Sequence, residues 1–146
     1  MSHWTRNWGK VLTLSRTQWV LLGKATVILL LIKAGLQLLS FNQFKRAYAY
    51  TLQVSRPTSY PTQYIADVAW AVRTVAYRLP FALTCLPQAL TVKFLLRRAS
   101  NLPLHIGVQT AATQGFQAHA WIEKDGQIVI GEWPEATNYR PIWVWQ

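Results

Sequence analysis

The stretch Leu79-Pro80-Phe81-Ala82-Leu83-Thr84-Cys85-Leu86-Pro87-Gln88 holds the features that decide the fold of this chain. Pro80 ends one helical pattern and Thr84 caps the next, so Cys85 falls at the start of a helix. Pro87 suits a first helical turn, where its missing N–H would have no partner. Because the positive end of a helix favours the thiolate form of a cysteine, Cys85 is a candidate nucleophile.

Apolar residues at helical spacing predict one helix on each side of the Pro80 break. The first covers about residues 62–79, with Thr62 as its expected N-cap and a single apolar face. The second runs from Thr84 to about Arg98 and ends in two arginines, which suit the negative end of a helix. The face of the first helix consists of Ile65, Val68, Ala69, Val72, Val75, Ala76 and Leu79.

Short alternating segments predict four strands after these helices, at 104–110, 116–123, 127–132 and 141–145. The dipeptide Asp125-Gly126 favours a type I′ turn between the second and third strands. Two helices followed by an antiparallel sheet indicate an α+β fold.

The predicted turn also gives a register for the hairpin. Counting outward from it places His119, in the strand sequence Ala118-His119-Ala120, opposite Glu132. A carboxylate in that place would orient the imidazole and stabilise its charged form. The predicted pairs are Lys124–Gln127, Trp121–Ile130 and His119–Glu132.

Each of these residues also has a purely structural explanation. A lone cysteine is usually a buried small residue, a strand histidine is usually structural, and Glu132 by itself is a surface carboxylate. The combination of Cys85, His119 and Glu132 points instead to a thiol hydrolase or acyltransferase, with Trp121 lining the substrate site. His105 is a rival base, but no acidic residue is expected opposite it.

The charge balance restricts the possible partners. The chain has 15 Lys and Arg against 5 Asp and Glu, a net charge of +10. Such a balance favours binding to an acidic peptide, a nucleic acid or an anionic membrane surface. Basic side chains that are simply exposed to solvent, with no charged partner, would explain it as well. No RNA-binding signature or dense basic run is present, so a nucleic-acid partner is not expected.

The cysteine and histidine counts bear on location and cofactors. One cysteine excludes an internal disulfide, which favours a cytoplasmic location. Three dispersed histidines predict neither a metal site nor a cofactor.

An apolar segment, Trp19–Leu39, is nearly long enough to span a bilayer. Lys24 and Lys33 interrupt it, which favours a helix packed on the protein or on a partner over one that contacts a membrane. No small-residue cleavage site follows, so a secretory signal is not expected. Serine and proline residues near 55–61 predict a boundary between an N-terminal helical extension, 1–55, and a catalytic domain, 56–146.

An ordered set of motifs in the catalytic half resembles the lasso peptide biosynthesis B2 proteins, a family of transglutaminase-like leader peptidases. The motifs are Cys85-Leu86-Pro87, Leu95-Leu96-Arg97-Arg98, Ile106-Gly107-Val108, Ala118-His119-Ala120-Trp121-Ile122-Glu123 and Asp125-Gly126. The resemblance implies a papain/transglutaminase-like fold in which Cys85 matches the nucleophile and His119 the base. Glu132 is the closest match to the family's acid, although it is displaced slightly from the usual position of an aspartate.

The resemblance also implies an activity and partners. A B2-type protein removes the leader from a ribosomally made lasso precursor peptide. It works with a separate PqqD-like leader-binding protein, and an ATP-dependent cyclase then closes the ring. The residues alone leave two alternatives open: an acyltransferase on the same scaffold, and a non-catalytic, basic, membrane-associated adaptor in which Cys85 belongs to the core.

Overall fold

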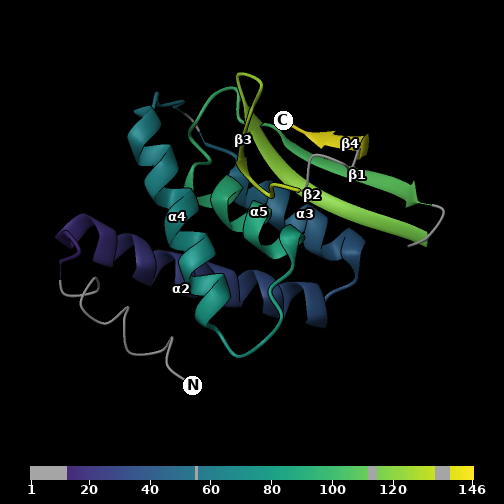
Figure 1. Cartoon of the computed structure of the whole chain (residues 1–146), viewed down its shortest axis with the longest axis horizontal. Helices are drawn as coiled ribbons and strands as arrows, with labels where there is room; N and C mark the ends of the chain where they lie inside the picture. The colour runs from purple at the N-terminus through teal and green to yellow at the C-terminus, as the bar shows by residue number, and fades with distance from the viewer. Residues whose placement is uncertain (1–12, 55, 112–114, 134–138) are drawn as a thin grey trace.

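The computed structural model describes residues 13–54, 56–111, 115–133 and 139–146. Within them four helices precede four strands, which confirms the α+β class (Figure 1). The helices are α2 (Arg16–Leu38), α3 (Phe41–Leu52), α4 (Thr62–Arg78) and α5 (Cys85–Leu95). The strands are β1 (Leu104–Ala111), β2 (Gly115–Lys124), β3 (Gln127–Ile130) and β4 (Arg140–Trp145).

The strands form one antiparallel sheet in the order β3-β2-β1-β4. β3 and β4 are therefore opposite edges, and the chain that joins them passes from one edge of the sheet to the other. In the central pair, Gly107 of β1 lies opposite His119 of β2, and Ile106 lies opposite Ala120.

The β2–β3 hairpin confirms the predicted turn but not the predicted register. Asp125 and Gly126 have φ angles of 50° and 80°, as a type I′ turn requires, and Lys124 pairs with Gln127. An irregularity in the ladder then shifts the register, so that Ile130 pairs with Ile122. The predicted pairing of Ile130 with Trp121 is therefore wrong.

The third strand also ends earlier than predicted. It stops at Ile130 rather than Glu132 because the next residue, Gly131, has a φ of +89°, outside the range of a β-strand. Because β3 ends here, no ladder pair joins His119 to Glu132, and the predicted pairing of these two residues is wrong.

The helices and the sheet share one hydrophobic core. The predicted apolar face of α4 is confirmed, with Val68 and Val72 fully buried, and α5 packs against β2. The helix ends differ slightly from the prediction: Pro61 takes the N-cap position of α4, and α5 ends at Leu95. The four helices cover one side of the sheet in Figure 1.

The N-terminal helices belong to the same core. One stripe of α2 is buried against α4 and α5, and α3 reaches β4, where the rings of Tyr48 and Trp145 meet edge to face at 5.0 Å. The buried residues of α2 are Leu21, Ala25, Leu29 and Ile32. The core thus crosses the boundary predicted at 55/56, and the division into two domains stays a prediction.

By length and composition alone, α2 would also be able to cross a membrane.

Candidate active site

Cys85 is the first residue of α5, and its side chain is half-buried against the core. Thr84 occupies the N-cap position with extended backbone, yet its side chain makes no capping hydrogen bond. The first N–H groups of α5 therefore lack the side-chain acceptor that usually covers a helix start. Such open N–H groups are suited to binding an oxyanion next to the thiol.

Two contacts hold the loop that leads into α5. The Gln88 side chain donates a hydrogen bond back to the Leu83 carbonyl at 2.8 Å, which closes the turn around Cys85. Lys33 of α2 donates to the Ala82 carbonyl at 3.1 Å. The N-terminal helix thus helps to position the start of α5.

His119 lies on β2 and is held by a backbone carbonyl. Its Nε2 is 2.6 Å from the Gly131 oxygen, and because a carbonyl only accepts, Nε2 must carry the proton of this hydrogen bond. In the neutral ring Nδ1 then has the free lone pair. A free Nδ1 is what a general base needs.

Aromatic rings pack around this imidazole. Tyr139 stacks on it with a centroid distance of 4.9 Å, and Trp121 lies near-parallel at 6.3 Å. Trp133 meets the imidazole and the Trp121 ring edge-on at 5.6 and 4.9 Å, respectively. On its other side Trp121 stacks on His105 at 5.2 Å. The histidine is therefore fixed in orientation by packing as well as by the hydrogen bond.

Trp121 was expected to line the substrate site, and the structure gives it a different environment. Only 3% of the residue is exposed, and its ring fills the space over Gly107, where an added Cβ would lie 2.7 Å from the indole. This placement supports a role in holding His119 and His105. Direct contact between Trp121 and a substrate stays a prediction.

The carboxylate of Glu132 points to another partner. It forms a hydrogen-bonded ion pair with Arg73 of α4, and the same guanidinium donates to the Val129 carbonyl at 2.8 Å. Arg73 thus joins α4 to the end of β3. Within the described residues, the Gly131 carbonyl, and not the predicted Glu132, receives the hydrogen bond of His119.

The thiol and the imidazole lie on neighbouring elements, but within the described residues no hydrogen bond joins them. Side chains alternate along β2, so His119 and Trp121 point to one face while Ala120 and Ile122 join the core shared with α5. The structure therefore places Cys85 and His119 on packed elements, α5 and β2, but turns His119 to the face of the sheet away from α5, and it does not assemble the predicted dyad.

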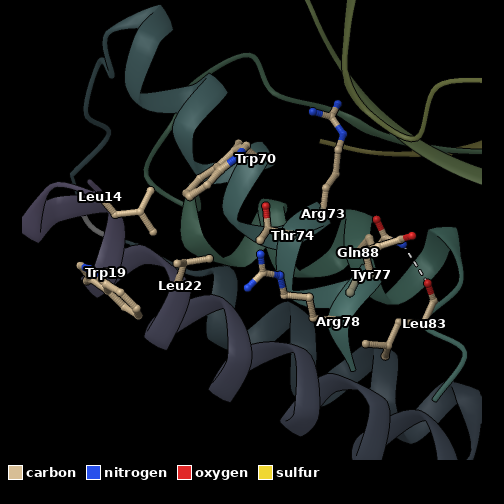
Figure 2. Close-up of a pocket in the computed structure, with 11 residues that line it drawn as sticks. Leu14, Trp19, Leu22, Trp70, Arg73, Thr74, Tyr77, Arg78, Leu83 and Gln88 are labelled. Atoms are coloured by element: carbon tan, nitrogen blue, oxygen red, sulfur yellow. Dashed lines mark hydrogen bonds between the residues drawn. The ribbon is translucent and has the colours of Figure 1, made fainter. Parts of the chain in front are cut away.

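A cavity of about 790 Å³ opens between α2 and α4 near the start of α5 (Figure 2). Apolar and aromatic side chains line one end, and Arg73, Gln88 and Leu83 line the other. The cavity therefore extends to the residues that hold Glu132 and the Cys85 loop. Its apolar end is formed by Leu14, Trp19, Leu22 and Trp70.

Two features of this site were absent from the sequence-based prediction. Gly131 had a signal, since a glycine directly after a strand often marks a positive φ. Arg73 had none, because its partner lies 59 residues further along the chain. Within the described part of the chain, no cluster of three metal-binding side chains is present.

A family model described as the Transglutaminase-like superfamily matches residues 28–144. This match covers most of the chain, which therefore belongs to the Transglutaminase-like superfamily. The match also begins inside α2 and so includes the second half of that helix. Comparisons with curated proteins and with solved structures give no significant match.

Proposed function

We propose that this protein is a cysteine peptidase that removes the leader from a ribosomally made lasso precursor peptide. The observation that carries the proposal is the sole cysteine of the chain as the first residue of a helix, in a transglutaminase-like scaffold. The carbonyl-held imidazole of His119 supports the same chemistry. The resemblance of the Cys85 and His119 motifs to B2 proteins supports the choice of substrate.

In the proposed reaction, Sγ of Cys85 attacks the carbonyl carbon of the last leader residue, and its proton passes to Nδ1 of His119. N–H groups in the first turn of α5 stabilise the oxyanion. The proton then moves to the leaving amine, and the core peptide departs. Water attacks the resulting thioester, which releases the leader as a free acid and restores the thiol.

This mechanism requires Cys85 and His119 to approach each other when substrate binds. His119 lies on the face of β2 turned away from α5, so this approach requires a rearrangement of β2 relative to α5 and more than the shortening of one hydrogen bond. The cavity between α2 and α4 is a suitable seat for an extended peptide, because its apolar wall leads towards Gln88, one turn after Cys85. We propose that the peptide occupies this cavity.

The proposed partners follow from the same resemblance. A separate PqqD-like protein presents the leader, and an ATP-dependent cyclase consumes the released core peptide. The reaction is proposed to take place on the cytoplasmic side of the membrane. Four of the five carboxylates of the chain lie beyond residue 122, so the rest of the chain is strongly basic. Its net charge of +10 suits acidic segments of a precursor peptide.

The test is mass spectrometry of a cognate precursor incubated with the protein and its leader-binding partner in heavy-oxygen water. Hydrolysis predicts a leader whose new C-terminal carboxylate carries one heavy oxygen. A new amide without label would instead identify the acyltransferase alternative. An unchanged precursor, with the partner present and the protein folded, would contradict both enzymatic proposals and leave the adaptor.

A further inference from the structure

Helix α2 has two apolar faces, and only one of them is packed. The inner face carries Ala25 and Leu29, which are fully buried. The opposite face, called the outer stripe here, consists of apolar side chains that are each at least 39% exposed. Its members are Trp19, Val20, Val27, Leu30, Leu31 and Leu38. An exposed apolar surface of this length marks a contact site.

The outer stripe contains no charged residue between its ends. At about 100° per residue, the exposed Gly23 and Ala34 fall along its centre, and Lys24 and Lys33 fall on its two flanks. Leu39 and Phe41 extend the exposed apolar surface past the end of α2. A continuous apolar ridge with lysines on both sides is the pattern of a helix that lies in a membrane surface.

The N-terminal sequence around α2 carries basic residues but no acidic ones. Residues 1–66 contain no aspartate or glutamate, whereas they contain eight lysines and arginines. These basic residues are Arg6, Lys10, Arg16, Lys24, Lys33, Lys45, Arg46 and Arg56. A segment that is both apolar on its surface and free of carboxylates is complementary to an anionic bilayer.

A hollow of about 490 Å³ lies beside the outer stripe. Lys24 and Arg97 contribute the cations that line it, and Val27 and Phe94 contribute to its apolar wall. Arg97 is held in place, since its guanidinium lies 4.6 Å from the centre of the Phe94 ring and donates to the Phe94 carbonyl at 3.2 Å. Two cations over apolar carbon suit a lipid phosphate and the start of its acyl chain.

We propose that α2 seats the protein on an anionic membrane surface through the outer stripe, with a lipid headgroup at Lys24 and Arg97. The helix lies on the membrane and does not cross it. A crossing would withdraw Ala25 and Leu29 from the core that α2 shares with α4 and α5. Figure 1 shows α2 on the side of the molecule away from β1 and β4, so the sheet would face the aqueous side.

The test is flotation of the full chain with vesicles of phosphatidylcholine alone and of equal parts phosphatidylcholine and phosphatidylglycerol. The wild-type protein should float with the anionic vesicles and be released by high salt. The double variant Val27→Glu with Leu31→Glu should bind about tenfold more weakly or worse, because both apolar contacts are lost. Val27 and Leu31 are 57% and 63% exposed, so the fold should survive, and circular dichroism checks this.

The matched control is Phe116→Glu with Ile142→Glu. It adds the same charge at side chains that are 70% and 63% exposed, but on the sheet. This variant should float as the wild-type protein does, and so should Cys85→Ala, since lipid binding is independent of the proposed peptidase reaction. Equal binding by the Val27/Leu31 variant and the wild type would overturn the proposal.

Two other outcomes would also overturn it. Concentration-dependent self-association without vesicle binding would assign the outer stripe to a second copy of the chain. Resistance to salt and alkaline carbonate, with release by detergent alone, would mean that α2 spans the bilayer.

Discussion

The imidazole Nε2 of His119 donates a hydrogen bond to the carbonyl oxygen of Gly131 at 2.6 Å. A backbone acceptor thus does the orienting that a triad usually assigns to a carboxylate, and it leaves Nδ1 as the free basic atom. The carbonyl is in this place because Gly131 has a φ of +89° at the end of β3.

Replacing Gly131 by alanine should therefore disturb both stability and His119. A Cβ at Gly131 would lie 2.5 Å from the Ala120 oxygen, in addition to the cost of a positive φ. Gly126→Ala is the matched control, since Gly126 has a φ of +80° but open space around it. We expect a loss of about 1 kcal/mol for Gly126→Ala and clearly more for Gly131→Ala.

Thermal unfolding measures the stability difference between these two glycine variants, and NMR exchange of the His119 ring N–H reports its hydrogen bond. Faster exchange in Gly131→Ala alone is the expected result. Equal unfolding free energies and equal exchange rates in the two variants would mean that the Gly131 backbone does not position the imidazole.

Glu132→Gln should reduce activity far less than His119→Ala does. The Glu132 carboxylate binds Arg73, and because both side chains are substantially exposed, losing the pair should cost less than about 1 kcal/mol. The comparison variant is Glu135→Gln, at a residue outside the described part of the chain. A loss of cleavage in Glu132→Gln as large as that in His119→Ala would restore Glu132 as the catalytic acid.

Stability should fall at alkaline pH because of Tyr48. Burial raises the pKa of Tyr48 above its usual value of 10.0, and its hydroxyl donates to the Leu90 carbonyl at 2.6 Å. The unfolded chain releases this proton first, so the stabilisation is present below pH 10 and is lost as the pH rises further. Tyr48→Phe should cost about 1 kcal/mol near neutral pH, through the lost hydrogen bond.

Urea unfolding across this pH range tests the assignment to Tyr48. The Tyr48→Phe variant should show a shallower alkaline loss than the wild type. Identical pH profiles would show that another group causes the loss.

The two faces of α2 should respond differently to truncation. Leu29→Ala removes a fully buried side chain and should lower the unfolding free energy by about 2–5 kcal/mol. Leu31→Ala, at a residue that is 63% exposed, should change it by less than about 0.5 kcal/mol. Chemical denaturation measures both. A small effect of Leu29→Ala would contradict the packing of α2 in the core.

The sequence predicts those parts of the site that depend on local signals. Thr84 and Pro87 indicate the start of α5, and the Asp-Gly pair indicates the turn and the first pairs of the hairpin. The register fails beyond the irregularity at Ile122/Glu123. A one-residue shift there depends on tertiary contacts, such as the hydrogen bond from Arg73 to the Val129 carbonyl, that no local pattern contains.

The packing of His119 could not be predicted for a similar reason. Trp133 and Tyr139 contact His119 from the connection between the two edge strands, and sequence spacing does not determine where such a connection passes. The apolar pattern of α2 likewise shows that the helix has two apolar faces but not which of them is packed. That choice depends on where α4 and α5 lie.

The central claim is that Cys85 and His119 act as one site, and the rate at which iodoacetamide alkylates the thiol at pH 7 tests it most directly. Cys85 is the only cysteine of the chain, so the modified mass reports this thiol alone. With precursor peptide and leader-binding protein present, we predict fast alkylation in the wild type and in His105→Ala, and a rate at least about tenfold lower in His119→Ala. The same slow rate in all three proteins would contradict the account.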